Sequence, residues 1–577
     1  MSTLLSLSNL LLSQIILEID DNVDIICLLL TCKKLYQNGS SLKRSIRFKG
    51  IGPIDTDNGD ILDNSISNQH VILSKDKEDE EYPLWIKDYT ENRIDKSINI
   101  TTVLVNEYEP KVLDSNLLYK IPSIETLFIY HSRIDLGSIS LLPNLQRLSV
   151  QGNSLTNLVH TQIINNNYST SELALEQYVS LTELTLNNLR SIGPGVLPSS
   201  LTSLTLTLLE FPQRDTFISL TSLVHLDIHV GKRLLAKQEE EEKLFIDLSS
   251  LSNLKRLEYS EYWHQKFGII FEICLPPSIV ILSFYSKNIQ IAQQQQQQQQ
   301  QCTTTTIMPV LEKLYLFESL LTGGKINLLS QCPSLKKLYS YDESVPLPES
   351  LVKLKGELTT SFLSSRPFAR HGQLKKLVWI YGYGGQGDDL DLSQSNLETI
   401  DLSDMHGFFT VTIPPSTKYL TIYLIQKQQD IPIFSISDRI TVPKKKQIQS
   451  QQQQQEQWLP ISTTHLTCSM SCTQSKWSFR LDEIINHTNV RYLSFSMSRN
   501  TTFLQFSIQR LDSDNTNVLV LERRSLLGGI ITQKRKENSN TNINLQQQQQ
   551  YSPFCLHFND YNSSSPFEFS WSFVKDK

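Results

Sequence analysis

The sequence has little of several features that would fix a compartment or a chemistry. Its 577 residues contain no apolar run of about 18 residues, the length that a membrane-spanning helix needs. The first residues carry no basic region followed by a cleavage site, so no secretory signal is expected. The net charge is only -6, which gives no general attraction to nucleic acid or to anionic membranes. We therefore expect a protein of the cytoplasm or nucleus with no nucleic-acid or membrane partner.

Cysteines and catalytic motifs are also scarce. The 8 cysteines lack the spacing of a disulfide framework, which is typical of a reducing compartment. His465, Cys468, Cys472 and His487 lie close together in the sequence, but their spacing fits no common zinc finger. The glycine-rich stretch 382–387 is followed by carboxylates rather than by a helix that could receive a phosphate. We predict no enzyme activity, no catalytic residue, no cofactor and no metal.

What the sequence does contain is a repeat, and its best copy is residues 144–155, NLQRLSVQGNSL. The copy fills the pattern L-x-x-L-x-L-x-x-N-x-L with Leu145, Leu148, Val150, Asn153 and Leu155. In a strand, Leu148 and Val150 would face one side, while Arg147 and Ser149 would face the other. This pattern resembles a leucine-rich repeat. One such unit cannot bury its own apolar face, so neighbouring units must stack on it.

Related units recur mostly about every 20 to 25 residues. Their first apolar positions are Ile100, Ile124, Leu145, Leu181, Leu201, Leu223, Leu254, Ile279, Leu311, Leu335, Leu374, Leu397, Thr417 and Val490. The longer gaps contain polar insertions, including the polyglutamine tracts 293–301 and 451–455, which we expect to loop out of the core. The fold class predicted is α/β, a leucine-rich-repeat solenoid whose parallel sheet lines a horseshoe.

The predicted domain order follows from these patterns. Residues 1–48 form a small helical leader, and the acidic, weakly periodic residues 49–95 form a linker. Residues 96–500 form the solenoid with its polyglutamine insertions. Residues 501–577 alternate apolar and polar positions, which predicts a β-rich cap over the open edge of the last repeat.

Residues 8–36 predict two short helices separated by the acidic turn 20–22. The leucines of the first helix, the Ile/Leu-rich second helix and the ending Cys-Lys-Lys-Leu-Tyr resemble an F-box. The resemblance implies docking to a Skp1-type adaptor, and hence a substrate-adaptor role in a cullin-type ubiquitin ligase. The implied adaptor-binding residues are Leu11, Ile15, Ile26, Leu29 and Leu30. The alternative is a helical cap that covers the first repeat.

Four units open with a shared phrase: LPSSL at 197–201, LPPSI at 275–279, LPESL at 347–351 and IPPST at 413–417. A proline directly before a strand ends the preceding segment. The phrase resembles half of an FNIP-type repeat, a divergent leucine-rich repeat, and the resemblance covers about residues 100–430.

The outward strand positions predict a partner-binding site for a protein on the concave face. In the units from Ile279 to Leu374 these positions turn from small polar residues to aromatic rings beside a column of lysines. An exposed aromatic cluster is typical of an interface hot spot, and lysines suit an acidic partner. The predicted residues are Tyr285, Lys313, Tyr315, Phe317, Lys337, Tyr339, Tyr341, Lys376, Val378 and Ile380. The alternatives are an insertion folded back over the rings, and a repeat scaffold with no role in ubiquitin transfer.

Overall fold

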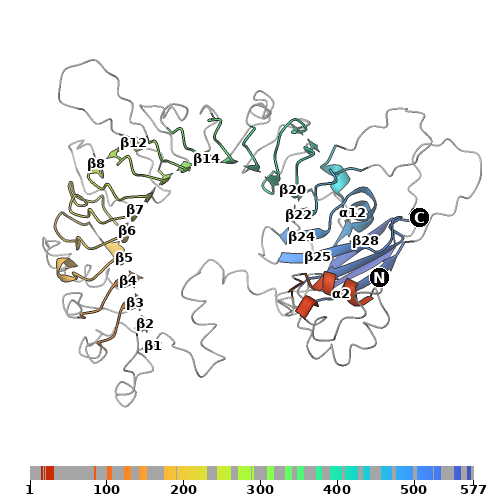
Figure 1. The fold of residues 1–577 in the computed structure, drawn as a ribbon, viewed down its shortest axis with the longest axis horizontal. Coiled ribbons are helices and arrows are strands. Elements are labelled where there is room, and N and C mark those ends of the chain that lie inside the picture. Colours follow the sequence, from red (N-terminus) through yellow and green to blue (C-terminus); the bar gives the residue numbers. More distant parts are fainter. Residues whose placement is uncertain are drawn as a thin grey trace, which may run out of the picture. The chain divides into compact units, whose positions relative to one another are not determined.

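A computed structural model divides the chain into two compact units (Figure 1). The first repeat unit is Ser65–Glu357, and the second repeat unit is Met1–Asn64 together with Leu358–Lys577. The structure describes residues 14–16, 18–19, 21–30, 84–85, 101–106, 122–130, 142–151, 175–189, 191–230, 244–261, 271–286, 289–291, 308–316, 332–340, 347–356, 372–379, 390–405, 410–425, 433–441, 457–470, 476–497, 503–523, 525–533, 551–559 and 568–573. The polyglutamine tracts, Asn153 and the stretch 382–387 lie outside these residues.

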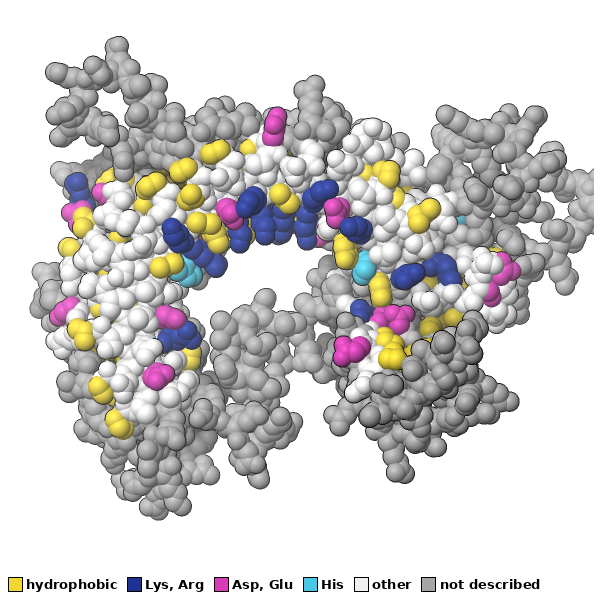
Figure 2. Space-filling model, viewed as in Figure 1, with side chains coloured by type: hydrophobic (Ala, Val, Ile, Leu, Met, Phe, Trp, Pro, Cys, Tyr) yellow, Lys and Arg dark blue, Asp and Glu magenta, His cyan; other side chains and the backbone are white. Residues whose placement is uncertain are grey.

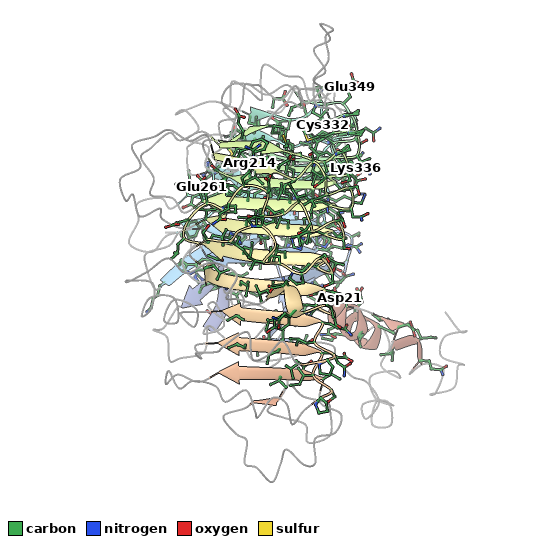
Figure 3. The ribbon with its side chains drawn as sticks, turned by 90° about the vertical axis from the view of Figure 1, so that its left-hand side faces the viewer. Asp21, Arg214, Glu261, Cys332, Lys336 and Glu349 are labelled. Atoms are coloured by element: carbon green, nitrogen blue, oxygen red, sulfur yellow. The ribbon has the colours of Figure 1, made fainter. Side chains whose placement is uncertain are left out.

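The first repeat unit is built on one parallel sheet in which strands follow one another in sequence order. Its strands are β1 (Leu84–Trp85), β2 (Thr102–Asn106), β3 (Thr126–Tyr130), β4 (Arg147–Gln151), β5 (Glu183–Leu189), β6 (Ser203–Leu208), β7 (His225–Val230), β9 (Arg256–Glu261), β11 (Ile281–Tyr285), β13 (Lys313–Leu316), β14 (Lys337–Ser340) and β15 (Lys353–Gly356). Each pairs with the next in parallel. The strands line the inner side of this unit's arc and stack as parallel arrows (Figures 1 and 3). The leucine-rich-repeat solenoid is confirmed.

Columns of aliphatic side chains form the core of this unit. In β6, Leu204, Leu206 and Leu208 are fully buried, while the residues between them are half-buried on the opposite face. The register aligns Leu204 with Leu226 of β7 and Leu206 with Ile228. Burying each such side chain contributes about 1.5–3 kcal/mol, so stacking stabilises strands too short to persist alone.

The four shared phrases that contain proline (LPSSL, LPPSI, LPESL and IPPST), which we call the proline phrases, each carry a serine that bonds one repeat to the preceding one. Ser200 Oγ donates to the carbonyl oxygen of Leu181 at 2.6 Å, so the turn of one repeat is bonded to the preceding one. The same bond recurs with Ser278 to Leu254 at 2.8 Å, Ser350 to Leu335 at 2.8 Å and Ser416 to Leu397 at 2.9 Å. Carbonyls at the turns, which no strand partner satisfies, are thereby hydrogen-bonded.

Shorter elements complete the first repeat unit. A second parallel sheet joins β8 (Leu244–Asp247), β10 (Phe271–Cys274) and β12 (Ile289–Ile291), and its β8 and β12 lie on the outer side of the arc in Figure 1. A 3-10 helix, η5, spans Leu175–Gln177. Within the stretch 49–95 expected as a linker, Leu84 and Trp85 form β1, which pairs with the otherwise open edge of β2.

The second repeat unit continues the repeats and then ends them. Parallel strands β16 (Lys376–Trp379), β18 (Thr399–Leu402), β20 (Tyr419–Leu424), β22 (His465–Met470) and β24 (Tyr492–Met497) are followed by antiparallel β25 (Phe503–Arg510), β26 (Asn517–Glu522) and β27 (Gly528–Thr532). A small parallel pair joins β17 (Leu390–Asp391) to β19 (Val411–Thr412). The change of direction at β25 covers the edge of β24, where another parallel repeat would otherwise be needed.

A second layer packs against these last strands. It contains β21 (Ile433–Phe434), β23 (Lys476–Arg480), β28 (Phe554–Asn559), β29 (Glu568–Phe573), the 3-10 helix η7 (Ile436–Asp438) and the helix α12 (Leu481–His487). The rings of Trp477 and Phe558 stack at 3.7 Å, and Phe495 of β24 meets both edge-on at 5.7 and 5.1 Å. These aromatic contacts hold the second layer against the repeat sheet.

The leader belongs to the second repeat unit. Residues 14–16 and 18 are helical, and α2 spans Asn22–Leu30, with the Ile25 amide donating to the Asp21 carbonyl at 3.2 Å. Ile26 and Cys27 of α2 pack against Leu519 and Leu521 of β26. The leader thus covers a strand near the end of the chain rather than the first repeat. Of the helices described, none is long and apolar enough to cross a membrane.

Candidate functional site

Lysine and tyrosine side chains gather on β13, β14 and β15, where Figure 2 shows a row of basic groups. The parallel register places Lys313, Lys337 and Lys353 in one column. It places Tyr315, Tyr339 and Lys355 in the next column. We call these residues the lysine–tyrosine patch. Since Leu314, Leu338 and Leu354 on the other face are buried, strand alternation turns the patch toward solvent.

The tyrosines of the patch hold each other in place. The Tyr315 and Tyr339 rings stack with centroids 4.1 Å apart and their planes inclined by 18°. Lys353 Nζ donates to Tyr339 Oη at 2.5 Å and lies 4.8 Å from the centre of that ring. Burial, together with a hydrogen bond to Tyr339, raises the pKa of Tyr315. The Tyr315 phenol is therefore protonated at neutral pH, and both rings are ordered before any partner arrives.

The patch carries an excess of positive charge. Lys336, one residue before β14, pairs with Glu312 at 2.6 Å. By contrast, Lys313 and Lys337 have no carboxylate within ion-pair distance among the described residues. Ammonium groups on neighbouring strands, about 4.8 Å apart, repel one another unless an anion lies between them. The arrangement favours an anionic partner.

The structure brings together some of the residues predicted from sequence and separates others. Tyr285 is partly exposed at the end of β11, two positions beyond the residue aligned with Tyr315. Lys376 and Val378 lie on β16 and are half-buried. They therefore belong to the second repeat unit and not to the lysine–tyrosine patch. Phe317, Tyr341 and Ile380 lie outside the described residues.

Sequence reasoning missed Lys353 and Lys355. Their repeat follows the LPESL phrase after a gap of only 16 residues from Leu335 to Leu351, which is shorter than the usual spacing of the units. The signal that could have found them is the alternation Lys353-Leu-Lys355 directly after the phrase. This alternation places both lysines on the face of Tyr339.

A polar cluster on β7 and β9 has the connectivity of a nucleophile, a base and an acid. His229 Nδ1 lies 2.5 Å from Ser260 Oγ, and His229 Nε2 lies 3.2 Å from Asp227 Oδ2. However, β7, β9 and β11 are each paired on both sides, so their amides are used in the sheet. Among the described residues no free amide lies beside Ser260 to stabilise an oxyanion, so we assign the cluster no catalytic step.

The histidines and cysteines with zinc-like proximity in the sequence are separated in space. Strand alternation in β22 places Cys468 in the core, while His465 lies on the opposite face between two tyrosines. His487 stacks on Trp458 at 4.2 Å, and Cys472 lies outside the described residues. No group of metal-ligating side chains occurs in the part of the chain that the structure describes.

The implied adaptor-binding residues have different environments. The Ile15 side chain is 40% exposed, whereas Ile26 is partly buried against β26. Leu29 and Leu30 lie in α2, but their side chains are outside the described part, as is Leu11. Of the two side chains that can be placed, one is therefore accessible and the other is engaged within the chain.

Comparison with known proteins adds little to these observations. No family model matches the chain, and no curated protein matches it. An internalin from Listeria monocytogenes is 16% identical, with a TM-score of 0.31 over 50% of this chain and 77% of the internalin. The TLR13–ssRNA13 complex is 16% identical, with a TM-score of 0.32 over 56% of this chain and 49% of TLR13. The circular leucine-rich-repeat protein CroV588 is 16% identical, with a TM-score of 0.28 over 68% of this chain and 62% of CroV588. The fold assignment rests on the sheet and its register instead.

Proposed function

We propose that the chain is a protein-recognition scaffold whose lysine–tyrosine patch binds an acidic segment of a partner protein. The observation that supports this proposal is the stacked pair Tyr315 and Tyr339, held by Lys353. Beside the pair, Lys313 and Lys337 have no acidic partner in the described part of the chain. Rings that are already ordered lose little conformational entropy on binding, and aromatic anchors dominate many interfaces. The lysines add attraction and orientation for carboxylates.

The test removes the two rings. In the Tyr315→Ala, Tyr339→Ala double variant, proximity labelling in cells and pull-down should lose the partner, with affinity reduced by about 2 kcal/mol or more for each ring that is buried at the interface. The matched control is Thr185→Ala with Thr205→Ala, two half-buried residues on the same face of neighbouring strands β5 and β6. Retention of every partner by the tyrosine variant would place recognition elsewhere.

We propose further that this recognition serves a cullin-type ubiquitin ligase in the cytoplasm or nucleus, with the leader docking a Skp1-type adaptor. The support is the F-box resemblance of residues 8–36 and the exposure of Ile15. The contact of Ile26 with β26 favours the alternative, a scaffold without ubiquitin transfer, because that side chain is already engaged.

Co-purification separates the two functions. The intact chain should retain the adaptor, whereas a form lacking residues 1–48 and the Leu29→Asp variant should lose it, because an unpaired carboxylate is disfavoured in an apolar interface. Absence of the adaptor from the intact chain would leave the scaffold function and remove the ligase function.

A further inference from the structure

A second aromatic surface, which the sequence patterns did not reveal, lies on the second repeat unit. Tyr419, His465 and Tyr492 occupy aligned positions of β20, β22 and β24. Their ring centroids are 4.6 Å apart at each step. The neighbouring residues Leu420, Leu466 and Leu493 are buried, so the rings lie on the face of the sheet away from the core. We call these three residues the ring ladder.

The ring ladder is too accessible to serve only as packing. Tyr419 is 48% exposed, and His465 and Tyr492 are half-buried. Contiguous exposed apolar side chains, such as three aromatic rings on an outward sheet face, commonly mark a surface that a partner covers. Thr421, Thr467 and Ser494, which are aligned two positions further along the same strands, are small and polar. The three large rings therefore project beyond a neighbouring row of small polar side chains.

Basic groups flank the ladder where its strands begin. Arg491 is exposed directly before Tyr492 and has no carboxylate partner among the described residues. Lys418, before Tyr419, is exposed and shares Glu398 with Lys375. With Arg523 beside Tyr492 there are four cations, against three carboxylates: Glu398 and the leader residues Asp21 and Asp24. The excess is one positive charge, and the leader carboxylates lie at the Tyr492 hydroxyl, so an acidic ligand is complementary to the side of Lys418 and Arg491.

The Tyr492 end of the ladder is also engaged within the chain. The Tyr492 hydroxyl donates to the carboxylate of Asp21 in the leader, and Asp24 lies near enough to act on it electrostatically. The Arg523 guanidinium lies 5.3 Å from the centre of the Tyr492 ring. Because the leader carboxylates face the hydroxyl, an acidic ligand should approach from the side of Lys418 and Arg491.

The stacking decides between two classes of acidic ligand. Single-stranded nucleic acid binds by placing bases on open ring faces. Here neighbouring ring centroids are only 4.6 Å apart, with the planes inclined by 36° and 30°, so no base fits between the rings, and Arg523 covers a face of Tyr492. The ladder instead presents ring edges, which carry partial positive charge and attract carboxylates, carbonyl oxygens and the faces of other rings. These are groups of a polypeptide.

We propose that the ring ladder, with Lys418 and Arg491, is a docking surface for an acidic polypeptide segment in which carboxylates flank an aromatic residue. Three strands at about 4.8 Å spacing span about 10 Å, which an extended chain covers with about three residues. The ligand side chains that contact the ladder are therefore few, and the carboxylates on both sides reach the basic groups. This surface is separate from the lysine–tyrosine patch and does not depend on its function.

The test uses the full chain carrying Tyr315→Ala and Tyr339→Ala, so that the lysine–tyrosine patch cannot account for the signal. The probe is a short fluorescein-labelled peptide whose central benzoyl-phenylalanine is flanked on both sides by glutamates. Fluorescence anisotropy gives its affinity, and mass spectrometry after irradiation locates the cross-link. We expect cross-links on β20 to β24, and a weakening of about tenfold or more when Tyr419→Ala and Arg491→Glu are added.

The matched control adds Ile461→Ala and Lys476→Glu instead. It removes another exposed apolar side chain and reverses another exposed cation, so its change in net charge is the same. Neither set alters the buried core, and circular dichroism verifies folding. Equal affinity of the two variants overturns the proposal, as do cross-links away from β20 to β24. Tighter binding of labelled oligouridine than of the peptide, lost with Tyr419→Ala, would replace the polypeptide with nucleic acid and also overturns it.

Discussion

At the scale of single residues, the serine of each proline phrase links successive repeats. Ser200 is half-buried and donates to the Leu181 carbonyl, whereas its neighbour Ser199 is exposed. Ser200 hydrogen-bonds a carbonyl group of the turn, whereas the side chain of Ser199 is exposed to water. The pair thus offers a comparison within one turn.

Ser200→Ala should lower the free energy of unfolding by about 0.5–1.5 kcal/mol, because it leaves the Leu181 carbonyl without its side-chain partner. Ser199→Ala should change it by less than about 0.5 kcal/mol. Urea denaturation followed by circular dichroism measures both. If the two variants unfold at the same urea concentration, the serine bond does not stabilise the turn.

Two histidines of β7 should respond to pH in opposite directions. A hydrogen bond to Asp227 raises the pKa of His229 above 6.5, although burial opposes it. Burial and then the charge of Arg256 lower the pKa of His225 below 6.5. The stability that His229 contributes is therefore present below its unfolded pKa and lost as pH rises through its folded pKa. For His225, whose pKa is lower in the folded protein than in the unfolded chain, the stability is present above its unfolded pKa and is lost as pH falls through its folded pKa.

His229→Gln should therefore cost stability mainly on the acid side of 6.5, and the cost should shrink as pH rises. His225→Gln should instead remove part of the loss that the parent suffers as pH falls below 6.5. Urea midpoints from about pH 5 to about pH 8 test both. The same slope for both variants would contradict the assignment of Asp227 to His229.

At the scale of elements, strand phase was predictable because it follows from alternation alone. The apolar positions Leu148 and Val150 are buried, and Tyr315 and Tyr339 face away from the core, as their spacing predicts. Burial on the outward face was not predictable. Ser149 alternates away from the core as expected, yet it is only 5% exposed. It is aligned between Phe128 of β3 and Thr185 of β5, whose larger side chains flank the small serine.

The ring ladder was missed for a related reason. Tyr419 and His465 come from repeats that are separated in the sequence by a long polar insertion. Only the register between β20 and β22 aligns them, and register between distant strands is set by how the insertions are accommodated. Each ring by itself is an ordinary surface residue. The ring ladder arises only because the three rings are aligned on neighbouring strands.

Leu148→Ala should destabilise the first repeat unit by about 2–5 kcal/mol, because Leu148 is fully buried and aligned with Leu127 and Leu184. Thr185→Ala is the control, since Thr185 is half-buried on the other face of the next strand. Chemical denaturation reports both. A loss at Thr185 as large as at Leu148 would mean that the outward face carries as much of the stability as the core.

At the scale of the whole molecule, the two ends of the chain meet within one unit. The resemblance of the leader to an F-box gave no hint of this, because it concerns a helix that docks to another protein. In the structure Ile26 and Cys27 contact Leu519 and Leu521, and Asp21 accepts a hydrogen bond from Tyr492 of the ring ladder. Contacts between residues so far apart in sequence have no local signature, so only the folded chain reveals them.

Removing residues 1–48 should expose Leu519 and Leu521, which are almost fully buried when α2 is present. Hydrogen exchange measured by mass spectrometry should then show faster exchange in peptides from β25 to β27, because local opening becomes less costly when apolar cover is lost. Peptides from β5 to β7 are the internal control, since they belong to the first repeat unit and should exchange at the parent's rate.

The point variant Ile26→Asp should reproduce the effect in part, because its carboxylate would face the same two leucines. Unchanged exchange in β26 for both proteins would mean that the leader rests on the second repeat unit without stabilising it, and would leave its apolar helix available to a partner.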